Sequence, residues 1–224
     1  MLKRLILLMV LITLSSSVFA QRFNKNTSDY GVRDGRWEAS ILLNSQFGAD
    51  KDFERGSSLE IDSKTGWGIT MGYNLSSKWN VAYKLSVNNP GYSATIVPED
   101  PAETQTIDYK MSKNTHQINL TYNFMDKAFT PFVQAGIGMT RLDSNIPSSP
   151  PQLNCWWDPW WGYICVDDWK TFATTKFSYN LGLGVRWDIN NALYSRASYN
   201  REFVSVKSGS LNFDTATLEM GLVF

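Results

Sequence analysis

Apolar and polar residues alternate along most of the chain, and this alternation limits the fold more than any other feature of the sequence. From Arg36 to Phe224, eight segments carry apolar side chains at every second position, with polar side chains or glycine between them. In the clearest segment, Phe177, Leu183 and Trp187 share one face. Successive side chains of a β-strand point to opposite faces, so this pattern predicts eight strands whose two faces meet different surroundings.

The connections between these eight segments alternate in length. The short connections are 74–78, 125–130 and 188–191, and the long ones are 48–57, 89–113, 143–175 and 204–212. Short turns at one end and long loops at the other are typical of an antiparallel up-and-down barrel. The sequence therefore predicts an all-β fold, an eight-stranded transmembrane barrel with short periplasmic turns and long extracellular loops.

The function depends on which face of the strands meets water. In a soluble lipocalin-like carrier the apolar face points inward, whereas in an outer-membrane barrel it points outward to lipid. Aromatic residues stand at both ends of the apolar face, as at Trp37 and Phe47, a spacing that suits a bilayer. The polar face carries eight of the fifteen glycines, which a narrow interior needs and a wet surface does not. These features favour the membrane orientation. Four apolar residues nevertheless fall on the polar face, namely Leu42, Phe132, Leu142 and Val223.

Charged residues share the polar face with these glycines. Eight strands enclose a space that side chains fill, so charges inside it must pair. We expect a lumen ion network that consists of Arg36, Glu38, Lys84, Arg186, Arg196 and Glu219. Counting residues from the short turns places Arg196 and Glu219 at similar heights on neighbouring strands, which predicts an ion pair between them.

The first twenty residues have the features of a secretory signal peptide. Lys3 and Arg4 precede an apolar run of ten residues, which is too short to span a membrane, and Val18-Phe19-Ala20 forms a small-residue cleavage site. We therefore expect a signal peptide at 1–20, a periplasmic segment at 21–34 and the barrel domain at 35–224.

The third long connection contains both cysteines of the chain. Cys155 and Cys165 should form a disulfide after export, which closes an eleven-residue ring and constrains the unfolded loop by roughly 3 kcal/mol. The candidate recognition residues in this ring are Trp156, Trp157, Trp160, Trp161 and Tyr163. Exposed aromatic residues on a closed ring suit partner recognition. The alternative is that they lie at the membrane interface or fold over the barrel mouth.

The chain resembles the small OmpA/OmpX-type family of outer-membrane barrels. The segments 131–138 and 180–185 are similar to strand cores of that family. Met220, Leu222 and Phe224 resemble the C-terminal signal that the barrel-assembly machinery recognises, although Glu219 stands where the family usually has glycine. The resemblance implies location in the outer membrane of a Gram-negative bacterium. It also implies three partners, namely outer-membrane lipid, lipopolysaccharide and, during biogenesis, the assembly machinery.

The composition excludes several functions. The chain is formally neutral, which argues against nucleic-acid binding, and its one histidine and two cysteines cannot build a histidine-rich or four-cysteine metal site. A lipid-modifying enzyme would depend on His116, with Ser112 or Thr115 as nucleophile, but a lone interfacial histidine is more often structural. We therefore expect a monomeric, cofactor-free barrel of structural or surface-interaction type and no enzyme. The alternative is a conduit for small hydrophobic solutes.

Overall fold

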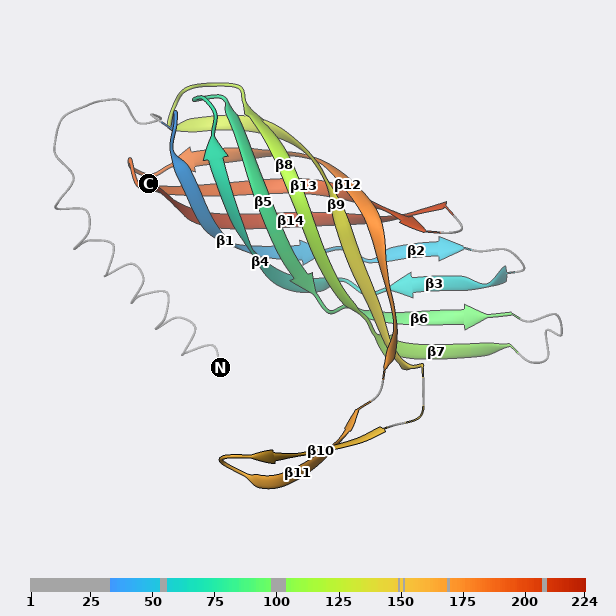
Figure 1. Cartoon of the computed structure of the whole chain (residues 1–224). Helices are drawn as coiled ribbons and strands as arrows, with labels where there is room; N and C mark the ends of the chain where they lie inside the picture. The colour runs from blue at the N-terminus through green and yellow to red at the C-terminus, as the bar shows by residue number, and fades with distance from the viewer. Residues whose placement is uncertain are drawn as a thin grey trace, which may run out of the picture. The chain divides into compact units, whose positions relative to one another are not determined.

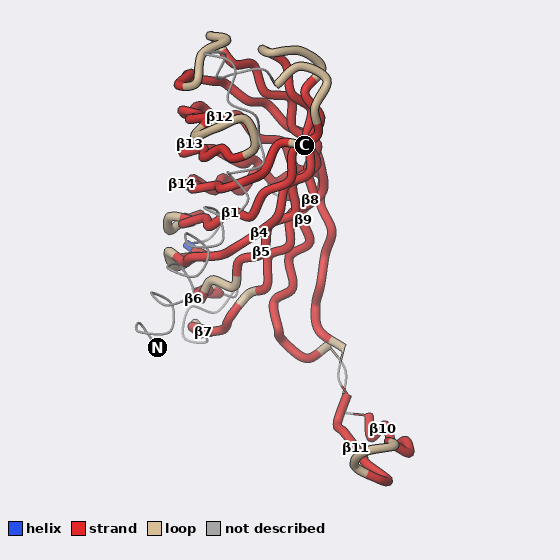
Figure 2. Tube along the Cα trace, turned by 90° about the vertical axis from the view of Figure 1, so that its left-hand side faces the viewer, coloured by secondary structure: helices blue, strands red, loops and turns tan. Residues whose placement is uncertain are grey.

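The computed structural model of the chain describes residues 33–52, 56–97, 104–148, 150, 152–168, 170–206 and 209–224. The predicted signal peptide and most of the predicted periplasmic segment lie outside these residues. Nearly all of the described chain is β-strand (Figure 2). Within the described residues, no helix is long and apolar enough to cross a membrane.

Eight antiparallel strands form a closed barrel, as the alternation predicts (Figure 1). They are β1 (Trp37–Gln46), β4 (Lys64–Asn74), β5 (Trp79–Asn88), β8 (Ser112–Asn123), β9 (Phe129–Pro147), β12 (Thr171–Asp188), β13 (Leu193–Val206) and β14 (Gly209–Val223). Around the barrel their order is β1, β14, β13, β12, β9, β8, β5 and β4, and β4 pairs with β1 to close the ring. The eight-stranded fold predicted from the sequence is confirmed.

The two ends of the barrel differ in their connections. Short turns join β4 to β5, β8 to β9 and β12 to β13 at one end, which we call the turn end. The C-terminal residue, Phe224, lies there too, because it exchanges two backbone hydrogen bonds of 2.9 Å with Trp37 at the start of β1. The opposite end, which we call the loop end, carries the connections from β1 to β4, from β5 to β8 and from β9 to β12. The segment 204–212, expected as a long connection, is instead strand up to Val206 and from Gly209 onward.

Two of the long connections contain strands that the alternation does not predict. Segments 48–57 and 89–113 contribute to a four-stranded sheet in the order β2 (Ala49–Asp52), β3 (Ser58–Ile61), β6 (Gly91–Ile96) and β7 (Gln105–Lys110). One face of this sheet carries Ile61, which packs with Met111 from the β7–β8 connection and with Val204 of β13. These strands are short, and a hydrophobic contact with the barrel rather than a long alternating pattern stabilises them.

The third long connection forms a two-stranded hairpin, β10 (Gln152–Asp158) and β11 (Gly162–Asp168). Cys155 and Cys165 are direct cross-strand partners, and a disulfide joins them. We call this segment the aromatic hairpin. Trp169, which follows it, lies outside the described residues.

The exposure of individual side chains shows which face of the barrel points inward. Trp79, Leu183 and Leu218 are 43%, 63% and 58% exposed on the outer surface. By contrast, Arg196 is only 6% exposed, and the side chain of Glu219 is only 12% exposed. This arrangement is the reverse of that in a soluble carrier, whose apolar side chains line the interior.

Glycines on the inner face make room for larger side chains opposite them. Leu42, which interrupts the polar face of β1, lies against Gly68, and Phe132 lies against Gly184. Gly138 is the most restricted case, because a Cβ there would overlap the backbone carbonyl oxygen of His116 on β8. The interior therefore requires small residues at fixed positions of the wall.

We predict that Gly138→Ala destabilises the barrel by about 1–3 kcal/mol, because backbone must move to admit the methyl group. The control is Ala135→Val on the outer face of the same strand, which should change stability by less than about 0.5 kcal/mol. Urea unfolding in detergent micelles, followed by tryptophan fluorescence, measures both variants. Equal stability of Gly138→Ala and the unmodified chain would contradict the close packing of the interior.

Candidate functional site

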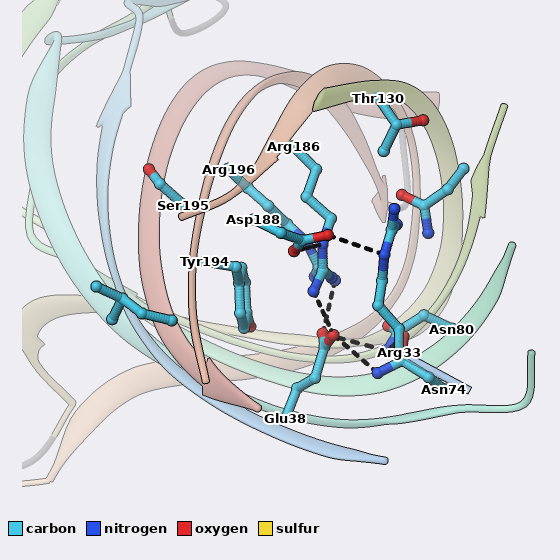
Figure 3. A network of polar contacts seen from close by, with 12 residues as sticks. Arg33, Glu38, Asn74, Asn80, Thr130, Arg186, Asp188, Tyr194, Ser195 and Arg196 are labelled. Atoms are coloured by element: carbon cyan, nitrogen blue, oxygen red, sulfur yellow. Dashed lines mark hydrogen bonds and ion pairs between the residues drawn. The ribbon is translucent and has the colours of Figure 1, made fainter. Parts of the chain in front are cut away.

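A buried carboxylate, Glu38, is the centre of an ion network inside the turn end of the barrel (Figure 3). Its two oxygens lie 2.7 Å from Arg186 Nη2 and 2.7 Å from Arg196 Nη2. Asn74 Nδ2 donates a further hydrogen bond of 2.8 Å to Oε1. Glu38 comes from β1, whereas the arginines come from β12 and β13, so these contacts cross the lumen.

Asp188 connects this network to Arg33, which precedes β1 in the chain. Its Oδ1 accepts a hydrogen bond of 2.7 Å from Arg186 Nε, and its Oδ2 lies 3.0 Å from Arg33 Nε. Arg33 is 1% exposed and also donates to the carbonyl oxygen of Lys127 in the β8–β9 turn, at 2.9 Å. The sequence placed Arg33 in the predicted periplasmic segment, and no pattern around it indicates that it enters the barrel.

Glu219 completes the network on the opposite side. Its Oε1 lies 3.5 Å from Arg196 Nη1 and accepts hydrogen bonds from Ser40 Oγ and Tyr194 Oη. The guanidinium of Arg186 stacks on the Tyr194 ring at 4.3 Å from the ring centroid. We call the whole set the turn-end cluster; it consists of Arg33, Glu38, Arg186, Asp188, Arg196 and Glu219. Three guanidinium groups and three carboxylates balance one another, which makes burial of six charges tolerable.

A second, smaller cluster lies inside the loop end. Lys113 Nζ is 2.6 Å from Glu202 Oε2 and donates a hydrogen bond of 3.1 Å to Gln46 Oε1. Thr140 Oγ1 donates a hydrogen bond of 2.6 Å to the other oxygen of Glu202. The Phe213 ring covers the ammonium group, with its centroid 3.8 Å from Nζ. Sequence reasoning did not assign this pair, since Lys113 belonged to a predicted long loop.

An apolar cluster lies next to this pair at the loop end. Its members are Ile61, Met111, Val204, Leu211 and Phe213. Tyr92 of the four-stranded sheet packs against it and donates a hydrogen bond of 3.3 Å to the carbonyl oxygen of Ser144. Burial, together with the nearby Tyr109, raises the pKa of the Tyr92 phenol, which stays protonated at neutral pH.

The structure brings together four of the six residues expected in the lumen network, including Arg196 and Glu219. Arg36 is not among them, because it precedes the first residue of β1 and its guanidinium donates to the carbonyl oxygen of Asn191 at the rim. Lys84 lies on β5 between the two clusters and forms no ion pair with any residue that the structure describes. Its position along the strand, more than its face, separates it from the network.

The aromatic hairpin leaves most of its aromatic side chains in solvent. The exposed fractions are 45% for Trp156, 73% for Trp157, 88% for Trp160, 80% for Trp161 and 69% for Tyr163. Asp158 Oδ1 accepts hydrogen bonds from the backbone N–H groups of Trp160 and Trp161, which fixes the turn. Gly162 follows with a positive φ of 74°, a conformation that favours glycine. The tip is therefore held in shape by a disulfide, a side-chain-capped turn and a glycine.

The structure places neither of the two candidate nucleophiles beside the His116 ring. His116 points outward from the barrel, and its Nδ1 lies 2.6 Å from the Tyr83 hydroxyl. Thr115 faces the lumen, where it hydrogen-bonds to Glu202. Ser112 lies on the same strand four residues before His116, about 13 Å from it. Within the described ranges, no group of three or more His, Cys, Asp or Glu residues could hold a metal ion.

The residues of the suggested assembly signal lie on the outer face of β14 and at its end. Met220, Leu222 and Phe224 are 52%, 56% and 65% exposed. Glu219, immediately before Met220 in sequence, points inward to the turn-end cluster. A charged residue is accommodated there because Arg196, Ser40 and Tyr194 hold it.

Comparison with known proteins identifies the family. A model of the outer membrane protein beta-barrel domain matches residues 6–224. The chain belongs to this family. Among solved structures, the fold is similar to that of outer membrane protein OprG from Pseudomonas aeruginosa, with a TM-score of 0.52, 15% identity and coverage of 87% of this chain and 98% of OprG. It is also similar to Neisserial surface protein A, with a TM-score of 0.50, 12% identity and coverage of 85% and 96%. A search of curated protein sequences gave no match.

This family membership gives the molecule an orientation. The protein is an outer-membrane barrel of a Gram-negative bacterium, as the resemblance implied. In such barrels the short turns are periplasmic and the long loops extracellular. The turn-end cluster thus lies at the periplasmic end, and the aromatic hairpin belongs to an extracellular connection.

We predict that Glu38→Gln destabilises the barrel by about 3–5 kcal/mol, because Arg186 and Arg196 lose the carboxylate between them while they stay buried. Glu60→Gln, on an exposed position of β3, is the control and should leave stability unchanged within about 0.5 kcal/mol. Urea denaturation in micelles gives both values. A Glu38→Gln barrel as stable as the control would show that the network does not hold this end together.

Proposed function

We propose that the protein is a surface-interaction protein, in which a barrel with a filled lumen presents the aromatic hairpin to a partner outside the cell. The observation that carries this proposal is the exposure of Trp157, Trp160 and Trp161, each at least 73% exposed on a disulfide-closed hairpin. Large exposed apolar groups gathered on one segment are characteristic of binding surfaces.

The construction of the hairpin supports a role in binding. Tryptophan and tyrosine dominate the energetics of protein interfaces, and they lose little side-chain freedom when they bind. The disulfide and the hydrogen bonds of Asp158 hold the hairpin before any partner arrives. Because ordering a flexible loop costs free energy on association, a segment that is already ordered binds more tightly.

The lumen contacts support a scaffold more than a conduit. The turn-end cluster crosses the barrel with contacts of 2.7 Å, and the Lys113–Glu202 pair crosses it again nearer the loop end. The apolar cluster around Phe213 adds a third layer. Free diffusion of a solute along the axis would have to break all three, so we propose a non-conducting barrel without enzymatic activity.

We predict that Trp157→Ser and Trp160→Ser each reduce adhesion of cells that display the protein by at least about tenfold, since hot-spot aromatic residues contribute about 2 kcal/mol or more. Adhesion is measured on arrays of immobilised glycans and proteins, with cells lacking the protein as background. Phe172→Ser, an exposed aromatic outside the disulfide ring, is the matched control and should bind normally.

The paired variant Cys155→Ser with Cys165→Ser separates rigidity from contact. We expect weaker adhesion than that of the unmodified chain, because the open hairpin must be ordered on binding. Unchanged adhesion together with lowered heat resistance would assign the disulfide a purely structural role. If Trp157→Ser and Trp160→Ser both adhere as strongly as the unmodified chain, the recognition proposal itself is refuted.

We predict that the purified barrel produces no steady conductance in a planar bilayer. We infer this from the two charged clusters and the apolar cluster, which lie across the direction in which ions would pass. Steady open channels from the unmodified protein would instead favour the conduit alternative.

A further inference from the structure

The aromatic hairpin presents rings on both of its faces and at its tip. Trp157 and Tyr163 are cross-strand partners on the face that also carries the disulfide, whereas Trp156 lies on the opposite face. Trp160 and Trp161 occupy the turn between the two strands. Rings that lie mostly in solvent offer their π-faces to a partner, and the face of an indole ring attracts cations.

The hairpin supplies no cation to these rings. Between Arg141 and Lys170 the sequence contains four aspartates and no lysine, arginine or histidine. Among the residues that the structure describes, cations stack only on Phe132, Tyr194 and Phe213, which face the barrel interior. A cation that stacks on the hairpin therefore has to come from a partner.

The connections at the loop end are acidic as a group. Residues 47–63, 89–111 and 148–170, which join the barrel strands there, contain twelve acidic residues and four basic ones. The whole chain is formally neutral, so its negative charge is concentrated in the extracellular connections. Complementary charge favours a partner and like charge disfavours it. A basic partner thus fits this surface, whereas an anionic lipid surface or an anionic polysaccharide does not.

Arginine is the side chain that suits both the rings and the charge. Its guanidinium is planar, stacks on aromatic rings and pairs with carboxylates. The barrel interior contains such a contact, because the Arg186 guanidinium lies 4.3 Å from the centroid of the Tyr194 ring. A neutral glycan suits the hairpin less well. Its hydroxyl groups need several oxygen-bearing side chains, and in 156–164 only Asp158 and Tyr163 have one.

We propose that the aromatic hairpin binds an arginine-rich, basic surface of a partner protein, with guanidinium groups stacked on the rings of Trp157, Trp160 and Trp161. This inference rests on the proposed function, because it names the partner of the same segment. The acidic connections attract the basic partner over a longer range, which raises the rate of association and makes it sensitive to salt. The stacked rings then slow dissociation.

The test is biolayer interferometry of the full-length barrel in detergent micelles against short peptides of equal length that contain only arginine, only lysine or only glutamine. The arginine peptide should bind most tightly, the lysine peptide at least about threefold more weakly, and the glutamine peptide not at all. Trp157→Ser with Trp160→Ser should weaken binding of the arginine peptide at least about tenfold, mainly through faster dissociation. Phe172→Ser is the matched control outside the disulfide ring and should bind normally.

A second variant separates the charge from the rings. Asp50 and Glu60 are exposed cross-strand partners on β2 and β3. Asp50→Asn with Glu60→Gln removes two negative charges and leaves the hairpin intact. This variant should slow association of the arginine peptide at low salt and leave its dissociation rate unchanged. Heat-modifiable gel mobility verifies that each variant is folded.

The outcomes distinguish this inference from the proposed function. The inference fails if the lysine peptide binds as tightly as the arginine peptide, because charge alone would then explain binding. It also fails, while the proposed function stands, if Trp157 and Trp160 support adhesion to neutral glycans or to phosphatidylcholine vesicles and the arginine peptide does not bind. Both fail if the tryptophan variants change neither peptide binding nor adhesion.

Discussion

Burying a charge inside a narrow barrel is costly unless an opposite charge lies beside it, and most charges in the interior of this protein are paired in this way. Glu38 of β1 lies between Arg186 of β12 and Arg196 of β13, and Asp188 and Glu219 contact the same two guanidinium groups. The two Glu38 contacts join strands that are not neighbours in the barrel, so they also hold its cross-section. Glycines opposite bulky lumen residues serve the same requirement, because they leave volume for side chains that must meet at the centre.

Much of the fold follows from the sequence, because the membrane imposes a strict difference between the two faces of each strand. Strand number, strand direction and the inward position of Arg196 and Glu219 follow from a period of two and from short turns that fix neighbouring strands in register. The cysteine pair was equally predictable, since two cysteines in one exported loop have no other partner. The disulfide and the barrel are both present in the structure.

Other parts depend on contacts between distant segments that carry no periodic pattern. The four-stranded sheet is stabilised by Ile61 against Val204 and Phe213, residues more than 140 positions apart in sequence. Lys113 and Glu202 are separated by 89 positions, and only strand register brings them together. Arg36 was wrongly expected in the lumen network. The alternation assigns it to the lumen-facing side, but it precedes the first residue of β1, where the alternation no longer decides which way a side chain points.

Arg33 has a consequence for the order in which the molecule is built. Its guanidinium needs Asp188 at the end of β12 and the Lys127 carbonyl of the β8–β9 turn, two places 61 residues apart that come together only when the strands between them are in register. Arg33 can therefore make both contacts only once those hairpins have assembled. Its full set of bonds thus depends on a ring that is already closed between β8 and β12.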